Sequence, residues 1–197
     1  MADRALVLAS ASPRRRELLT QIGVAHRVAP VGLDESRRRG EAPADYVLRL
    51  AREKADAGWQ LLTDREREVV LAADTAVVLG DDILGKPRDR TEALAMLLQL
   101  SGRTHQVLTA VALRDTRGIA SQLSESLVTF RPISREEAEQ YWATGEAQDK
   151  AGAYAIQGRA AVFVERIEGS YSGVMGLPLF ETARLLGAAG LKPASQS

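Results

Sequence analysis

Short apolar runs alternate with amphipathic stretches along the chain, a pattern that predicts a β-sheet flanked by helices. Strands are expected at residues 5–9, at 26–30, in two or three short pieces within 68–87, in a hairpin over 105–130 that turns at 115–118, and at 160–169. Helices are expected at residues 13–21, 44–62, 91–100, 134–144 and 177–186. The predicted fold class is therefore α/β.

The helix expected at residues 13–21 begins in an unusual way. Ser12 has a side-chain oxygen suited to the N-cap, and Pro13 suits the first helical position. Three arginines, Arg14–Arg16, then fill the first turn, where the positive end of the helix dipole makes each basic residue cost about 0.3–1 kcal/mol. This placement raises the question of which anion the helix end would bind.

Composition narrows the class of protein. The chain has 197 residues, 45% apolar and 26% charged, and we predict one domain over residues 1–190 with a C-terminal tail at 191–197. The 26 basic and 26 acidic residues cancel, so no overall charge draws the chain to nucleic acid or to a membrane. The absence of cysteine excludes disulfides and thiolate chemistry. No signal-peptide pattern and no apolar run of about 18 residues occurs, so a cytoplasmic location is expected.

Lysine is rare in this chain. Only four of the 26 basic residues are lysine: Lys54, Lys86, Lys150 and Lys192. A lysine kept in such a background can mark a place where a compact ammonium group is needed. Lys54 lies in a predicted helix and Lys86 follows a predicted strand, so a solvated helix face and a turn are the alternatives for these two residues.

Two carboxylates are candidates for chemistry. Asp74 follows the apolar run 69–73, so we expect it near a strand end, where its side chain can enter a cleft; a turn-forming cap is the alternative. Glu35 lies in a polar loop, where an isolated glutamate would simply be solvated. Because Mg²⁺ often takes one or two carboxylates together with substrate phosphates, this pair could hold such a cation.

Other kinds of catalytic or nucleotide site are not indicated. The phosphate loops GxGxxG and GxxxxGK[ST] are absent. His26 and His105 lie on predicted strands without a Ser–His–Asp spacing, so a structural role is expected for both. The remaining carboxylates, lysines and arginines are typical of metal-assisted phosphoryl chemistry, in which charge neutralisation and positioning provide most of the catalysis.

Seven segments of the chain resemble the Maf-like nucleoside triphosphate pyrophosphatases, historically called septum-formation inhibitors. The segments follow the family's order and cover nearly the whole chain: LASASPRRRELL, DES, LAREKA, AADTAVVLGDDILGKP, SGRTHQV, DKAGAYAIQG and IEGSYSGVMGLPL. The resemblance implies a Maf/ITPase-like α/β fold, with an elongated mixed β-sheet flanked by helices, two lobes and a central cleft. It also implies a homodimer.

The same resemblance implies an activity, the hydrolysis of a nucleoside triphosphate between its α- and β-phosphates to the monophosphate and pyrophosphate. Asp74 would accept the proton of the attacking water, and Glu35, Lys54 and Lys86 would complete a catalytic pocket that binds metal and phosphates. Glu35 and Asp74 would hold the divalent cation, most readily Mg²⁺, with Mn²⁺ as an alternative. The implied substrate-binding residues are Ser10, Ser12, Arg14, Arg15, Thr75 and Gln157.

A triphosphate would answer the question raised by the arginines. The N–H groups and dipole of a helix N-terminus favour an anion. Arg14 and Arg15 add fork-shaped donors that match phosphate oxygens. Binding of a nucleotide, and not stability of the helix, would then explain why arginines occupy the first turn.

Three positions bear on which nucleobase the protein recognises. Arg14, Thr75 and Gln157 resemble the branch that acts on dTTP and UTP, whereas the branch that prefers 7-methyl-GTP has a bulky aromatic residue, a glutamine and a glutamate there. The amide of Gln157 offers a donor and an acceptor that match the O4 and N3–H edge of thymine or uracil. We therefore expect Gln157 to read the base beside Thr75.

Three alternatives remain open. The first is a pyrophosphatase of the same family that acts on 7-methyl-GTP or on a modified pyrimidine nucleotide. The second is a nucleotide-binding regulator of cell division or septum formation. The third is a nucleic-acid-binding module that uses the arginine runs at 14–16 and 37–39, which zero net charge and few aromatic residues disfavour.

Overall fold

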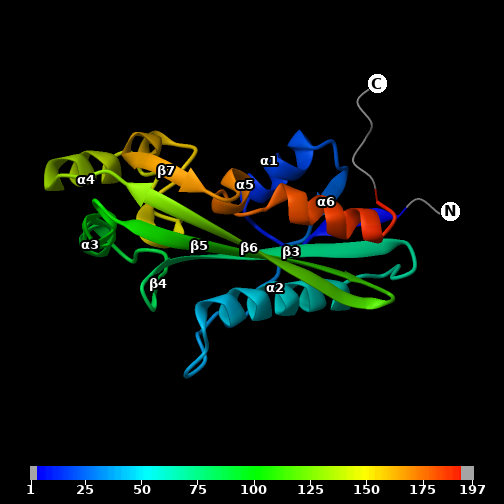
Figure 1. The fold of residues 1–197 in the computed structure, drawn as a ribbon. Coiled ribbons are helices and arrows are strands. Elements are labelled where there is room, and N and C mark those ends of the chain that lie inside the picture. Colours follow the sequence, from blue (N-terminus) through cyan, green and yellow to red (C-terminus); the bar gives the residue numbers. More distant parts are fainter. Residues whose placement is uncertain (1–3, 192–197) are drawn as a thin grey trace. The chain divides into compact units, whose positions relative to one another are not determined.

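The computed structural model describes residues 4–191 and shows a mixed sheet with helices packed against it (Figure 1). The strands are β1 (Ala5–Leu8), β2 (His26–Val28), β3 (Glu68–Leu79), β4 (Asp82–Leu84), β5 (Thr104–Asp115), β6 (Gly118–Phe130) and β7 (Val164–Glu168). The α-helices are α1 (Pro13–Gln21), α2 (Pro43–Gln60), α3 (Arg90–Leu100), α4 (Arg135–Trp142), α5 (Tyr171–Val174) and α6 (Leu179–Ala188). Short 3₁₀ helices occur at Ala151–Ala153 and Arg159–Phe163. The predicted C-terminal tail lies outside the described residues, apart from Leu191.

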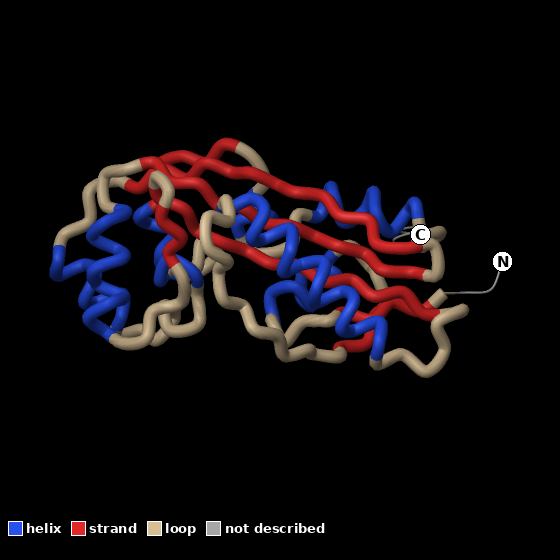
Figure 2. Tube along the Cα trace, turned by 90° about the horizontal axis from the view of Figure 1, so that it is seen from below, coloured by secondary structure: helices blue, strands red, loops and turns tan. Residues whose placement is uncertain are grey.

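The seven strands form one sheet in the order β2-β1-β3-β5-β6-β7, and β4 pairs with β3. β1 is parallel to both of its neighbours, and its last paired residue, Leu8, lies opposite Val28 of β2 and Leu71 of β3. β4 and β7 pair antiparallel with β3 and β6, so the sheet is mixed, as predicted. The long strands β3, β5 and β6 lie side by side (Figure 2). In the described part of the chain, no helix combines the length and the apolar character needed to cross a membrane.

One strand prediction is confirmed with a longer strand than expected, and another is wrong in extent. Residues 68–87 contain two strands, β3 and β4, separated by a turn at residues 80–81, in agreement with the predicted two or three. β3 is longer than expected, with 12 residues, because Asp74 in its middle is hydrogen-bonded by a lysine and does not interrupt the strand. The strand expected at 160–169 is 3₁₀ helix as far as Phe163, and only Val164–Glu168 pairs with β6. The predicted hairpin and the five long helices are present with small shifts at their ends.

The chain divides into two compact units. The first unit comprises residues 4–74, 109–124 and 176–191, and the second comprises residues 75–108 and 125–175. β3, β5 and β6 each contribute residues to both units. Each unit therefore contains only part of each of these three strands.

In the first unit, α2 lies on one face of the sheet, and α1 and α6 lie on the other (Figure 1). Side chains alternate between the faces of a strand, so Val70, Ala72 and Asp74 of β3 share one face. Gly58 of α2 packs on that face, because a Cβ at this position would lie 2.8 Å from Val70 Cγ1 and 3.0 Å from Ala9 Cβ. The helix α2 thus covers the face of β3 that carries Asp74.

In the second unit, aromatic rings gather around Phe130. The ring centroids of His105 and Tyr154 lie 5.0 and 4.8 Å from that of Phe130, and both pairs are edge-to-face. His105 Nε2 lies 2.8 Å from Tyr154 Oη, and the histidine is only 2% exposed. This histidine is part of the core, in agreement with the structural role expected for it.

Candidate active site

The ends of neighbouring parallel strands bring several of the predicted residues together in the first unit. β1 ends just before Ser10 and α1, and β2 ends before the loop that carries Glu35. β3 continues past the last residue paired with β1 and so reaches Asp74. The prediction that Asp74 lies near a strand end is wrong, because β3 runs on to Leu79; Asp74 lies instead beyond the end of the neighbouring strand β1. The carboxyl edge of parallel strands is the usual position of a ligand in α/β sheets.

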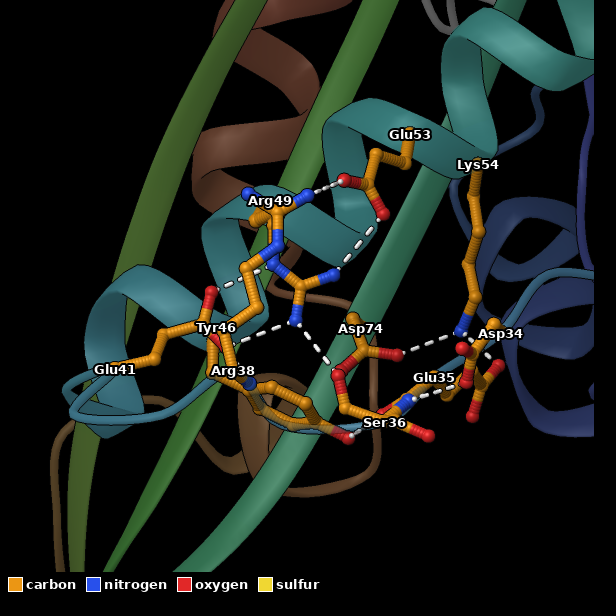
Figure 3. Close-up of polar contacts among 10 residues, drawn as sticks. All are labelled: Asp34, Glu35, Ser36, Arg38, Glu41, Tyr46, Arg49, Glu53, Lys54 and Asp74. Carbon is orange, nitrogen blue, oxygen red and sulfur yellow. Dashed lines mark hydrogen bonds and ion pairs between the residues drawn. The ribbon is translucent and has the colours of Figure 1, made fainter.

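Lys54 of α2 joins the two carboxylates (Figure 3). Its Nζ donates a hydrogen bond of 2.7 Å to Asp74 Oδ1 and lies 2.7 Å from Glu35 Oε1. The side chains of Lys54 and Asp74 are 10% and 9% exposed, whereas that of Glu35 is 50% exposed. Lys54 comes one turn before Gly58 on the same face of α2, so it reaches β3 from the point where helix and strand pack most closely. A solvated helix face is therefore excluded for this lysine.

Burial and charge act on Asp74 in opposite directions. Burial raises the pKa of the Asp74 carboxyl above its usual range, while the positive charges of Lys54 and Arg15 oppose this shift. Burial likewise lowers the pKa of the Arg15 guanidinium, and the charges of Asp74 and Glu35 oppose that shift. The site thus places two cations beside two anions, of which Asp74 is buried and Glu35 is half-exposed.

Ser10 and Arg15 order the loop between β1 and α1. Ser10 Oγ accepts hydrogen bonds from Ser12 N and from Arg15 Nη1, both 3.2 Å long, and Arg15 Nε donates to the carbonyl oxygen of Gly176 at 2.8 Å. The predicted side-chain cap is wrong: Ser12 is the N-cap residue, but its hydroxyl makes no capping hydrogen bond. Its N–H is turned instead toward Ser10. A helix N-terminus without a side-chain cap suits an anionic ligand.

Arg14 does not join the cluster of Lys54, Glu35, Asp74 and Arg15. Its guanidinium pairs with Glu17 on the same helix, and its side chain is 42% exposed. Arg15 and Arg14 therefore differ in setting although both lie in the first turn. Arg15 is bound to Ser10 and Gly176 and is influenced by the charges of Asp74 and Glu35, whereas Arg14 lies on the helix surface.

Three further predicted residues belong to the second unit. Thr75 follows Asp74 in β3 and is half-buried. Lys86 is exposed in the loop after β4. Gln157 is half-buried in the turn Ala155–Gly158, which is closed by a 2.9 Å hydrogen bond from Gly158 N to Ala155 O.

The donor set of the first unit fits a hard divalent cation. The carboxylates of Glu35 and Asp74 come from different elements and meet at one ammonium group. Within residues 4–191, no group of three or more His, Cys, Asp or Glu side chains is arranged to hold a metal. Since Mg²⁺ commonly completes its shell with water and phosphate oxygens, two carboxylates suit a cation that binds together with a nucleotide.

Two residues of this region were not predicted from the sequence. Arg49 and Tyr46 of α2 bind the loop that carries Glu35. Their signal was helical spacing: Tyr46, Arg49 and Glu53 recur at three and four residues and so share a face of α2.

The fold and the site define a mixed α/β protein with a buried lysine–carboxylate centre at the carboxyl edge of parallel strands. Over residues 5–189 the sequence matches the model of the Maf-like protein family, and the chain belongs to this family. It is 61% identical over 184 residues to a dTTP/UTP pyrophosphatase from Alkalilimnicola ehrlichii, in an alignment that covers 92% of this chain and 91% of the relative. Relatives of the same name from Hahella chejuensis and Cupriavidus metallidurans are 54% and 57% identical, over 96% and 94% of this chain and 94% and 97% of their own length. The resemblance found in the seven segments is confirmed.

Proposed function

We propose that this protein is an enzyme that hydrolyses dTTP and UTP to the monophosphate and pyrophosphate with a divalent cation, most readily Mg²⁺. Relatives named for this activity are 54–61% identical over most of both chains, which supports the proposal. The structural observation that carries it is Lys54, held between the buried Asp74 and the loop carboxylate of Glu35. A homodimer stays a prediction of the resemblance, and a cytoplasmic location stays a prediction from the sequence pattern.

The phosphates would be bound by cations that the fold already holds in place. Arg15 is anchored by Ser10 and Gly176, so it offers its charge with little loss of side-chain freedom. The uncapped N-terminus of α1 lies next to it in the chain and favours an anion. In this proposal Ser10, Ser12 and Arg15 contact the triphosphate, and Arg14 contributes through its charge at the helix surface.

Asp74 would be the general base. The oxygen of a water molecule bonds to the α-phosphorus, one proton of that water passes to the Asp74 carboxylate, and the bond from the α-phosphorus to the bridging oxygen breaks so that its electron pair leaves with pyrophosphate. The raised pKa of Asp74 makes it a stronger base than an exposed aspartate. Lys54 fixes the orientation of the carboxylate through Oδ1. A cation held by Glu35 and Asp74 would neutralise charge on the phosphates.

Residues of the second unit are assigned to recognition of the nucleobase and to the leaving group. We assign reading of the pyrimidine edge to Gln157, with Thr75 beside it, and charge neutralisation on pyrophosphate to Lys86. Gln157→Glu replaces a donor-and-acceptor amide by an acceptor. This variant is therefore expected to lower the preference for dTTP over GTP, and an unchanged preference would overturn the assignment.

A product assay tests the reaction. The protein is incubated separately with dTTP, UTP, CTP, dATP and 7-methyl-GTP, with Mg²⁺ and with EDTA, and pyrophosphate is resolved from orthophosphate. Metal-dependent pyrophosphate from dTTP and UTP alone is the expected result. Pyrophosphate mainly from 7-methyl-GTP would keep the reaction and overturn the substrate. Orthophosphate, or no product, would overturn the reaction and favour the nucleotide-binding regulator.

A further inference from the structure

Glu35 depends on a loop with little regular structure of its own. The chain between the end of β2 at Val28 and the start of α2 at Pro43 contains no helix or strand. Its internal backbone bonds include the turn in which Glu41 N donates to Arg38 O at 3.1 Å. A long connection of this kind needs side-chain anchors to hold one conformation. The position of the Glu35 carboxylate is therefore set by what holds the loop.

Arg49 of α2 binds this loop at two places (Figure 3). Its Nε and Nη2 donate to the two carboxylate oxygens of Glu41 at 2.6 and 2.8 Å, which is the strong two-bond geometry of an arginine–carboxylate pair. Nη2 also donates to the carbonyl oxygen of Ser36 at 3.1 Å, and Nη1 donates to Glu53 of the same helix at 3.1 Å. One guanidinium thus ties residues 36 and 41 of the loop to α2.

The backbone on either side of Glu35 is held as well. Tyr46 Oη donates to the carbonyl oxygen of Glu35 at 2.9 Å, and the guanidinium carbon of Arg49 lies 5.6 Å from the centre of the Tyr46 ring. Asp34 Oδ1 accepts a 2.9 Å hydrogen bond from Ser36 N. The bonds made by Arg49, Tyr46 and Asp34 therefore fix the peptide groups from which the Glu35 side chain extends to Lys54.

The ion pair between Arg49 and Glu41 is largely buried, and both groups keep their charge. The side chains of Arg49 and Glu41 are 13% and 9% exposed. The hydrogen bonds from Arg49 lower the pKa of Glu41 to about 2. Glu41 therefore stays ionised, and the ion pair is kept, at any pH well above that value. The bonds of Arg49 go to Glu41, Glu53 and Ser36 and not to Lys54 or Asp74. The hydrogen bonds of Arg49 therefore reach the active site through the loop and not by direct contact.

We propose that Arg49 is a positioning residue that holds the Glu35 loop on α2, so that the Glu35 carboxylate meets Lys54 at the active site. The inference rests on the proposed function and goes beyond it, since it assigns a role to a residue that would not contact the nucleotide. A residue of this kind acts on turnover and on metal use through the group it orients. Loss of such an outer partner typically costs roughly 10–100-fold in activity or metal affinity.

A double-mutant cycle separates positioning from general damage to the protein. Arg49→Gln is expected to lower the kcat for dTTP roughly 10–100-fold with KM nearly unchanged and with a higher half-saturating Mg²⁺ concentration. Arg49→Lys keeps the charge without the fork and should fall between Arg49→Gln and the wild-type protein. In a Glu35→Gln background, adding Arg49→Gln should lower kcat by less than about twofold, because the carboxylate that Arg49 positions is already absent. Full additivity of the two losses would overturn the proposal.

Hydrogen exchange gives a readout that does not need activity. Amide exchange of a peptide covering residues 33–41 should be faster in Arg49→Gln than in the wild-type protein. Arg52→Gln is the matched control, because Arg52 lies on the same helix and donates to Ser121, away from the loop. Unchanged exchange in Arg49→Gln, or equal changes in both variants, would overturn the inference. If the wild-type protein releases no pyrophosphate, the proposed function fails, while the exchange experiment still decides whether Arg49 holds the loop.

Discussion

Asp74 occupies a position that is costly for a folded protein and useful for a base. Its side chain is 9% exposed, and burial raises its pKa. The ammonium group of Lys54, 2.7 Å away, opposes that shift and keeps the carboxylate form accessible. Lys54 therefore sets how basic Asp74 is, in addition to holding its orientation.

Asp74→Asn tests the base. The amide has nearly the shape of the carboxylate but cannot accept the proton, so turnover of dTTP is expected to fall by roughly 10²–10⁴. The measurement is kcat from released pyrophosphate. Asp56→Asn is the matched control on α2, since Asp56 is half-exposed and pairs with Arg114. Wild-type turnover in Asp74→Asn would eliminate the role of this residue as the base.

The pH profile tests the influence of Lys54. The base must be deprotonated, so kcat/KM should fall as the pH drops through the raised pKa of Asp74. In Lys54→Gln the charge that lowers this pKa is lost, and the acidic limb should move to higher pH while the plateau falls. A limb at the same pH in both proteins would show that another group controls it.

Individual residues could be predicted from the sequence where their type was unusual for their place. Rare lysine and an aspartate after an apolar run drew attention to Lys54 and Asp74, which the structure places 2.7 Å apart. Arg49 and Glu41 could not be distinguished from solvated charges, because an ion pair between residues eight apart depends on how the loop folds back. Arg14 shows the opposite limit, since adjacent arginines on one helix turn point in different directions.

At the scale of elements, the local signals at Ser134 and Gly102 were reliable, whereas the side-chain cap expected at Ser12 and the extent of the strands were not. Ser134 and Glu137 form the capping box that their spacing predicts, and Gly102 ends α3 with a φ of 65°. The extent of β3 depended on a partner that is remote in the sequence, because Lys54 satisfies the aspartate that interrupts its apolar pattern. Pairing across the sheet is a non-local property that periodicity does not record.

Gly58→Ala tests whether the packing of α2 on β3 places Lys54. The new Cβ would lie 2.8 Å from Val70 Cγ1 and 3.0 Å from Ala9 Cβ, so α2 or these neighbours must shift. Overpacking of this kind costs about 1–3 kcal/mol, and urea unfolding should show a loss of that size together with a lower kcat.

The same substitution elsewhere provides the control. Gly187 lies in α6, and a Cβ added there would have no heavy atom of another segment within 4 Å. Gly187→Ala should therefore leave kcat unchanged and stabilise the helix by up to about 1 kcal/mol. Val70→Ala combined with Gly58→Ala should recover part of the lost activity by making room for the methyl group. Full activity in Gly58→Ala would show that the placement of Lys54 does not depend on this contact.

At the scale of the whole molecule, the α/β class follows from the alternation of apolar and amphipathic segments, and the mixed sheet from the resemblance to the Maf-like family. The division into two units does not follow from that alternation. One of its four boundaries falls between Asp74 and Thr75, inside β3, where no change in composition marks a linker. Strands that serve both units are continuous in the sequence, so only the packing of distant segments reveals where one unit gives way to the other.

The acid stability of the second unit should depend on His105. Burial lowers the pKa of its imidazole to about 4, from the ordinary value of 6.5. Folding thus favours the neutral ring, so this contribution to stability is complete above pH 6.5 and is lost as the pH falls from there through about 4. The shift corresponds to at most about 3 kcal/mol. A fall of stability in this window would come before the loss of carboxylates whose pKa is already low, such as Glu137 at about 2.

Urea unfolding of wild-type and His105→Gln proteins between pH 7 and pH 4 measures this term. Each is made in a Trp59→Phe background, so that Trp142 of α4, the remaining one of two tryptophans, reports on the second unit. Glutamine can keep a hydrogen bond to Tyr154 but does not titrate, so its free energy of unfolding should fall less steeply with decreasing pH. The gap between the two proteins should narrow by up to about 3 kcal/mol toward pH 4. Parallel profiles would mean that the pKa of His105 is the same in the folded and unfolded states. The loss of stability at low pH would then come from protonation of the carboxylates in ion pairs.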